Sequence, residues 1–143
     1  VLLKKLSDAL GAFDASLQQL GVSDKVTTFT ASDFGRTLSL NGDGTDHGWG
    51  GHQFVMGGSV LGKAFYGAVP PLSTSNTDAP QDQWHVGQGR LLPSTSVDQF
   101  AATLARWFGV AENELYGVLP NLGHFGDRAG RSDYPVNLGF MTA

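Results

Sequence analysis

The stretch VTTFTASDFGRTLSLNGDGTDHGWGGHQFVMGGSVLGKAFY, residues 26–66, decides the fold and holds most of the residues able to do chemistry. It opens with Val26–Ala31, a run typical of strands because five of its six residues are Val, Thr or Phe. A carboxylate, a glycine and an arginine follow directly, at Asp33, Gly35 and Arg36. Ligands in α/β proteins bind outside the carboxyl ends of strands. We therefore predict a functional site at this point.

A polar, glycine-rich loop is predicted to follow, with a second strand over 53–56. The loop carries two aspartates and two histidines, Asp43, Asp46, His47 and His52. Asn-Gly and Asp-Gly are common turn pairs, which assigns Asp43 to a turn. Neutral imidazole and carboxylate together suit zinc or another divalent ion. The residues alone leave two interpretations, a metal site and a hydrogen-bonded polar loop.

Arg36 and Trp49 are the candidates for contact with a substrate. A guanidinium group matches phosphate or sulfate oxygens in a fork. Arg36 therefore either holds an anion or forms a structural salt bridge to Asp33 or Asp46. Trp49 lies between two glycines, and it either lines a pocket or packs the loop down.

Amphipathic helices are predicted on both sides of this stretch. Leu or Phe recurs at alternating three- and four-residue spacing over residues 2–20, which indicates a helix lying on a sheet. A second helix is predicted over 96–108, with a capping box completed by Asp98 or Gln99. A shorter helix is predicted over 111–118. The alternation of helix, strand and loop predicts an α/β fold, in which helices flank a short sheet.

Residues 68–93 are predicted to be mostly loop, because prolines and Ser, Thr and Asn residues dominate them. His85, beside Trp84, is interpreted as part of a packed surface pair. A short hairpin or edge strand is predicted over 86–92.

Length and composition exclude several classes of protein. The 143 residues suit a single domain, residues 1–143, with a hydrophobic core. A net charge of −4 argues against a nucleic-acid partner. The absence of cysteine excludes disulfides, thiolate metal sites and a cysteine nucleophile. No apolar run approaches membrane-spanning length, so no membrane partner is predicted. No signal-peptide pattern is visible, and the opening Val-Leu-Leu favours a fragment of a larger α/β protein.

Several strings together carry a family resemblance: FTASDFGRT at 29–37, NGDGTDHGWGGHQFVMGGSVLG at 41–62, and LLPSTSVDQFAATLARWFGV with LPNLGHF at 91–125. They resemble domain-of-unknown-function family 1501, exported bacterial proteins grouped with the sulfatases and alkaline phosphatases. The resemblance covers nearly the whole chain. It implies the carboxyl-terminal portion of an alkaline-phosphatase-like fold. Because the family's proteins are longer and begin with a twin-arginine export signal, it also implies an exported, periplasmic origin.

The resemblance also implies roles for single residues. In the alkaline-phosphatase-like superfamily, an Asp-His pair after a central strand and a later His in a glycine-rich loop bind two metal ions. Asp33 matches that Asp, whereas Phe34 stands where the metal-binding His would be. His47 or His52 matches the later His. Asp46 is either a ligand or a group that orients His47.

The leading hypothesis is a metal-dependent hydrolase of phosphate or sulfate esters, with its site in the loop 33–52. The ion would be zinc, manganese, calcium or magnesium, and the substrate a small anionic ester. The predicted metal ligands are Asp33, Asp46 and His47. The predicted catalytic residues are Asp33, Arg36 and His52, and the predicted substrate contacts are Arg36 and Trp49. The superfamily's nucleophile comes from an amino-terminal half outside this chain.

Two alternatives stay open. A metal-free glycoside or carboxylic-ester hydrolase would use Asp33 and Asp46 as its carboxylate pair, with Trp49 and Trp84 as sugar platforms. A non-catalytic binding or structural module would use the loop histidines only to order the glycine-rich segment, and Phe34 favours this alternative.

Self-association is also predicted. A piece of a larger sheet exposes apolar surface, so we expect a homo-oligomer formed through the helix over 3–20 or through an open sheet edge.

Overall fold

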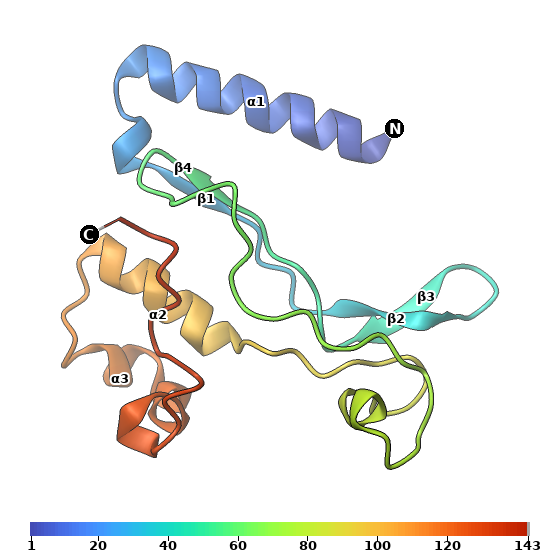
Figure 1. Ribbon diagram of the computed structural model, residues 1–143. Coiled ribbons are helices and arrows are strands. Elements are labelled where there is room, and N and C mark those ends of the chain that lie inside the picture. The colour runs from blue at the N-terminus through green and yellow to red at the C-terminus, as the bar shows by residue number, and fades with distance from the viewer. Residues whose placement is uncertain (143) are drawn as a thin grey trace.

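The computed structural model describes residues 1–142 and combines helices with two separate antiparallel ribbons (Figure 1). The α-helices are α1 (Leu2–Leu20), α2 (Val97–Phe108) and α3 (Leu115–Val118). The strands are β1 (Thr27–Phe29), β2 (Gly35–Leu40), β3 (Thr45–Gly48) and β4 (Val55–Gly57). Short 3-10 helices lie at Ser23–Lys25, Pro80–Trp84, Pro120–His124 and Asp127–Ala129. The predicted α/β class is confirmed.

The first ribbon pairs β1 with β4, and it lies between α1 and α2 (Figure 1). Thr28 lies opposite Met56, and Phe29 lies opposite Val55. On the α2 side, the ring of Phe29 meets the edge of Phe100, with 5.9 Å between ring centroids. Both strands were predicted from their residue types, and their pairing builds a small α-β-α sandwich at this end of the molecule.

The second ribbon corrects the predicted loop, because β2 and β3 form a hairpin there. The turn between them is Asn41-Gly42-Asp43-Gly44, in which both glycines have positive φ and the N–H of Asn41 donates to the carbonyl of Gly44 at 3.0 Å. Asn-Gly and Asp-Gly are the strongest local signals for a hairpin turn. The same residues that indicated a loop therefore reverse the chain and pair its two arms.

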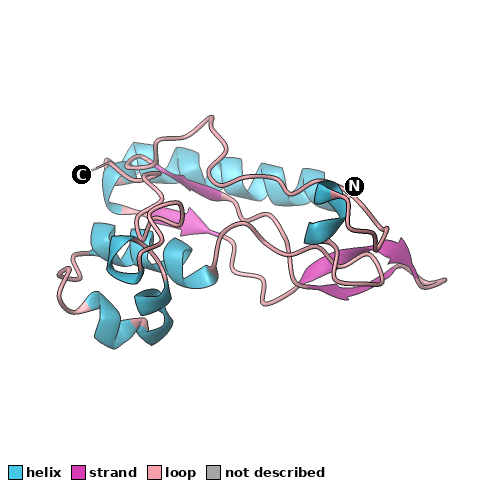
Figure 2. Cartoon of the chain, turned by 60° about the horizontal axis from the view of Figure 1, so that its bottom comes forward, coloured by secondary structure: helices cyan, strands magenta, loops and turns pink. Residues whose placement is uncertain are grey.

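Helix α1 ends at Gly21, which has φ of 68° as a left-handed helix terminator does. Its predicted apolar stripe is mostly uncovered. Leu17 is buried, whereas Leu3 is 78% exposed and Leu20 is 73% exposed. The helix runs alongside the first ribbon and extends past it over the loops (Figures 1 and 2). The expectation that the whole stripe is covered by a sheet is therefore wrong, because Leu17 is the one buried residue of this helix.

Helix α2 begins with the predicted capping box, completed by Gln99. The Ser96 hydroxyl accepts from the N–H of Gln99 at 3.1 Å, and the Gln99 side-chain oxygen accepts from the N–H of Ser96 at 2.9 Å. Ala102 of α2 packs with Leu115 and Leu122 in the fully buried core. The helix predicted over 111–118 starts only at Leu115, because a turn precedes it.

Two buried polar side chains join α2 to the tail of the chain. The Gln99 amide nitrogen donates to the carbonyl of Pro135 at 2.8 Å. The Thr103 hydroxyl donates to the carbonyl of Gln99 at 2.9 Å and accepts from the N–H of Leu138 at 2.9 Å. Both side chains are 2% exposed. The irregular tail is therefore held to the helix by hydrogen bonds that exclude water.

The predicted loop over 68–93 is confirmed, and it folds around a buried carboxylate. Asp82, in the 3-10 helix Pro80–Trp84, accepts hydrogen bonds from the hydroxyls of Ser73 and Thr77. These two bonds stabilise the ionised form and lower the pKa of Asp82. The carboxylate therefore holds the irregular segment that contains Ser73 and Thr77 against this 3-10 helix.

His85 is buried, not a surface residue as predicted, and both its ring nitrogens are bonded. The N–H of Gly89 donates to Nε2 at 2.8 Å, so Nδ1 carries the proton and donates to the carbonyl of Ser75 at 3.0 Å. His85 also forms an isolated antiparallel bridge with Leu91, which agrees with the hairpin predicted over 86–92.

Within residues 1–142, no helix combines the length and the apolar character needed to cross a lipid bilayer.

Replacing Thr103 by Val is expected to lower the free energy of unfolding by about 1–3 kcal/mol, because the buried N–H of Leu138 loses its acceptor. Thr103→Ser keeps the hydroxyl and is expected to retain most of the stability. Urea unfolding followed by tryptophan fluorescence measures both. Equal losses in the two variants would show that the methyl group removed by Thr103→Ser matters as much as the hydrogen bond removed by Thr103→Val, and would contradict this expectation.

Replacing Asp82 by Asn is expected to make the melting temperature depend less on pH under acidic conditions. The folded-state pKa of Asp82 lies below its unfolded value, so ionised Asp82 stabilises the fold above about pH 4. That contribution is lost as the pH falls through the folded-state pKa. Melting temperatures between pH 3 and 7 test this, with the exposed Asp78→Asn as control. A wild-type profile matching that of Asp82→Asn would contradict it.

Candidate functional site

The residues predicted for the site lie on the β2–β3 hairpin and on the loops that flank it. All are exposed, and they are Asp33, Arg36, Asp46, His47, Trp49 and His52. At the base of the hairpin the first residue of β2 closely approaches the loop after β3, since a Cβ at Gly35 would overlap the carbonyl oxygen of Gly50. The structure therefore brings these residues into one region without burying any of them.

Phe34 organises the base of the hairpin. Its ring stacks on the imidazole of His47, with centroids 3.6 Å apart and planes 10° apart. The guanidinium carbon of Arg36 lies 5.1 Å from the centroid of the same ring. Arg36 also donates to the carbonyl of Thr45 at 2.8 Å. Within residues 1–142, Arg36 makes no ion pair with Asp33 or Asp46, so the proposed structural salt bridge is wrong.

Asp46 is separated from its neighbour His47 by strand geometry. Consecutive residues of a strand point to opposite faces. Its carboxylate accepts from the side-chain amide of Asn41 at 2.7 Å, and its N–H donates to the Thr37 hydroxyl at 3.1 Å. Asp46 therefore stabilises the turn of the hairpin and does not orient the imidazole of His47.

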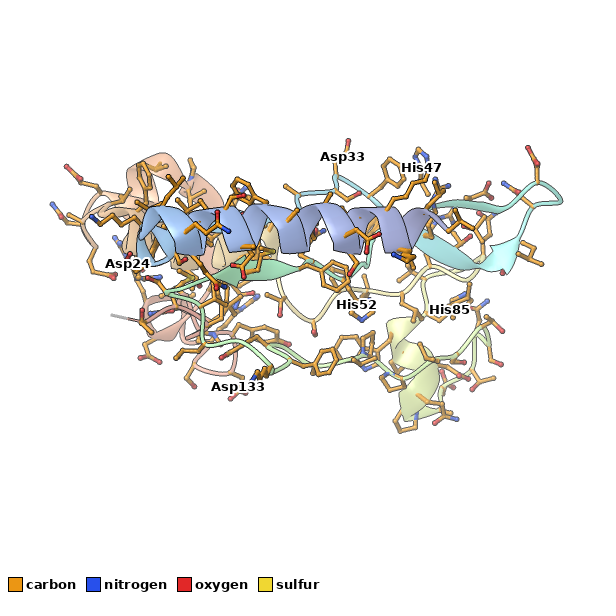
Figure 3. The ribbon with its side chains drawn as sticks, turned by 90° about the horizontal axis from the view of Figure 1, so that it is seen from above. Asp24, Asp33, His47, His52, His85 and Asp133 are labelled. Carbon is orange, nitrogen blue, oxygen red and sulfur yellow. The ribbon has the colours of Figure 1, made fainter. Side chains whose placement is uncertain are left out.

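The predicted metal ligands do not converge. In the view of Figure 3, Asp33 and His47 lie on one side of α1 and His52 on the other. Among residues 1–142, no three His, Asp or Glu side chains lie close enough to hold one ion. With His47 stacked on Phe34 and Asp46 bonded to Asn41, this set of residues does not fit a divalent metal.

A cleft of about 540 Å³ lies beside the hairpin, and the sequence indicated only part of it. Its apolar wall consists mainly of four aromatic residues, Trp49, Trp84, Phe125 and Tyr134. Trp49 and Trp84 were considered as a pair of sugar platforms, and the structure brings them to one cleft. Phe125 and Tyr134 were missed, because they come from the irregular tail and only the folded chain places them near Trp49.

The polar groups of this aromatic cleft are neutral. Gln83, Ser94, Thr95, Ser96 and Gln99 line it, and no Asp, Glu, Lys or Arg side chain does. The Gln83 amide donates to the carbonyl of Thr77 at 2.9 Å. In Gln99, the side-chain oxygen and the side-chain nitrogen are both hydrogen-bonded. Across residues 1–142, no hydrogen bond is formed by the indole N–H groups of Trp49 and Trp84 or by the Tyr134 hydroxyl. The cleft therefore offers aromatic faces together with neutral donors that are free to bind a ligand.

The chain is similar to a known protein family. A family model described as "Protein of unknown function (DUF1501)" matches residues 1–119. No curated protein matches, and no solved structure matches. The grouping with sulfatases and alkaline phosphatases and the exported origin stay predictions. Because the match covers most of the 143 residues and includes the hairpin and α2, this chain belongs to the DUF1501 family of proteins of unknown function.

Proposed function

We propose that this chain is a non-catalytic binding module whose aromatic cleft takes a neutral, hydroxyl-rich ligand, a saccharide. The observation that carries the proposal is the lining of the cleft, where Trp49, Trp84, Phe125 and Tyr134 meet only uncharged polar groups. Ligand pockets of about 300–1,000 Å³ that combine aromatic walls with a few polar groups are typical of small-molecule binding. The volume of this cleft lies in that range.

Saccharide chemistry matches both parts of the lining. A sugar ring has an apolar C–H face that packs on an aromatic ring, and its edge carries hydroxyl groups that accept hydrogen bonds. Trp and Tyr suit such ligands, because each joins a large apolar body to one polar group. The indole N–H groups of Trp49 and Trp84 and the hydroxyl of Tyr134 are the donors available to sugar oxygens. A phosphate or sulfate ester would instead require Arg or Lys, and neither lines the cleft.

Binding without hydrolysis follows from the absence of acids in the cleft. Glycoside hydrolysis requires two carboxyl groups flanking the scissile bond, about 5–10 Å apart. Asp33 and Asp46, the predicted carboxylate pair, do not line the cleft. No other Asp or Glu among the described residues lines it. The cleft is thus equipped to hold a sugar but not to cleave it.

Metal-dependent hydrolysis of phosphate or sulfate esters stays a prediction. Its proposed ligands Asp33, Asp46 and His47 are exposed and do not meet at one point. No arrangement of residues in the described part of the chain favours it over saccharide binding.

Saccharide binding is tested by titrating the chain with maltotriose, cellotriose and chitotriose while tryptophan fluorescence is recorded. At least one trisaccharide is expected to change the emission, since two of the three tryptophans line the cleft. Trp49→Ala is expected to weaken binding by about tenfold or more, equivalent to about 1.4 kcal/mol. Trp107→Phe is the matched control, because Trp107 lies outside the cleft. No response to any of the three sugars, or unchanged binding by Trp49→Ala, would refute the proposal.

The metal hypothesis has its own test. After dialysis against zinc, manganese, calcium and magnesium, and then against buffer, the chain is expected to retain no stoichiometric ion by mass spectrometry. One retained equivalent that disappears in the His47→Ala/His52→Ala double variant would restore ester hydrolysis as the leading hypothesis.

A further inference from the structure

One edge of strand β1 has no partner in the described chain. The N–H of Thr30 donates to the carbonyl of Phe54 at 3.0 Å, and the N–H of Phe54 donates to the Thr30 hydroxyl at 2.9 Å, so the backbone groups of these two residues point toward each other. Hydrogen-bonded and non-bonded pairs alternate along antiparallel strands. In the printed register, Thr28 therefore bonds to Met56, whereas the N–H and C=O groups of Thr27 and Phe29 point away from β4. These groups form an open edge.

The open edge borders a groove of about 450 Å³ that is almost entirely apolar. On the β1 side it is lined by Thr27 and Phe29 together with the charged residue Lys25, and on the α2 side by Leu104, Trp107 and Phe108. Phe108 is 83% exposed and Phe29 is 48% exposed. Helix α2 therefore presents more apolar surface than the two-stranded ribbon covers, in the place where a further strand would lie.

We propose that β1 of a second copy fills this position, so that two chains form one continuous sheet in the order β4-β1-β1-β4. An isolated two-stranded ribbon is marginally stable in water, and additional strands or helices are needed to stabilise it. Strand addition at an open edge provides backbone hydrogen bonds, and the adjoining groove takes side chains. The interface goes beyond saccharide binding and does not depend on it.

The sequence of β1 suits pairing with itself. Residues 26–31 carry no charge and are mostly Val, Thr and Phe, so two copies meet without repulsion. A two-fold axis at Thr28 places Thr27 opposite Phe29 of the partner subunit. Both residues turn their backbone groups outward, so this register forms hydrogen bonds at both pairs. A strand with the same charge at positions 27 and 29 would instead place like charges opposite each other.

The same axis brings the two α2 helices together. It is perpendicular to the sheet, so both helices lie on the same face of the four-stranded sheet. The exposed rings of Phe108 then cover each other's groove, and the removal of this apolar surface from water favours the dimer.

The first experiment is sedimentation equilibrium of the chain and of a Thr27→Pro variant. Wild type is expected to show a concentration-dependent monomer–dimer equilibrium. Proline lacks an N–H, and the N–H of Thr27 is not used inside the ribbon, so Thr27→Pro is expected to be a folded monomer with unchanged circular dichroism. Val26, at φ −126° and ψ 123°, already has the extended conformation that a residue before proline adopts. A wild-type monomer at all concentrations would overturn the proposal.

A second variant decides the outcome even if Thr27→Pro fails to fold. Phe108→Lys places a charge in the groove at a position exposed in the monomer, and it is expected to raise the dimer dissociation constant at least about tenfold. Val118→Lys is the matched control, since Val118 is 61% exposed, ends helix α3 and does not line the groove. A dimer that Phe108→Lys leaves unchanged would be formed by another face, such as α1, and would contradict pairing through β1.

Discussion

The side chain of Gln99 is the contact on which the candidate site depends. Its oxygen accepts the N–H of Ser96 and completes the cap of α2, and its nitrogen holds the carbonyl of Pro135. Ser96 itself and Tyr134, the residue directly before Pro135, both line the aromatic cleft. A buried amide with both ends satisfied has one orientation only, because any rotation leaves a polar group unpaired. The start of a helix and a tail without regular structure are thereby held against each other, and the cleft lies between them.

Local patterns in the sequence were sufficient to predict the elements that depend on neighbouring residues, namely the long helices. The spacing of Leu and Phe gave the helix over 2–20, and Ser96 with Gln99 gave the start of α2. The hairpin at 35–48 was missed because its glycines were interpreted as loop residues, although Asn-Gly-Asp-Gly is also a hairpin turn. The short sheet became two ribbons because β2 and β3 pair with each other and not with β1. Pairing of this kind is a non-local choice that residue propensities do not specify.

At the candidate site, too, local sequence patterns identify single residues but not the way in which the fold arranges them. Asp46 and His47 are adjacent in the sequence, and in a flexible loop they could bind one ion together. In a strand they face opposite ways, so the segment does not adopt the conformation in which both side chains would bind one ion. Phe34, which takes the place of an expected ligand, uses its ring to hold His47 and Arg36. The aromatic cleft depends on chain segments as distant as Trp49 and Tyr134, and no local pattern links them.

Helix α1 has few buried side chains, and this affects the motions of the chain. Within its predicted stripe only Leu17 is buried, and the helix spans about 28 Å at 1.5 Å per residue. Opening its first turns therefore exposes almost no additional apolar surface. Segments with few buried contacts open with free energies well below that of global unfolding. The amide hydrogens of α1 should then exchange with solvent in a separate, faster class than those of α2, so that the chain fluctuates as two cooperative units of unequal stability.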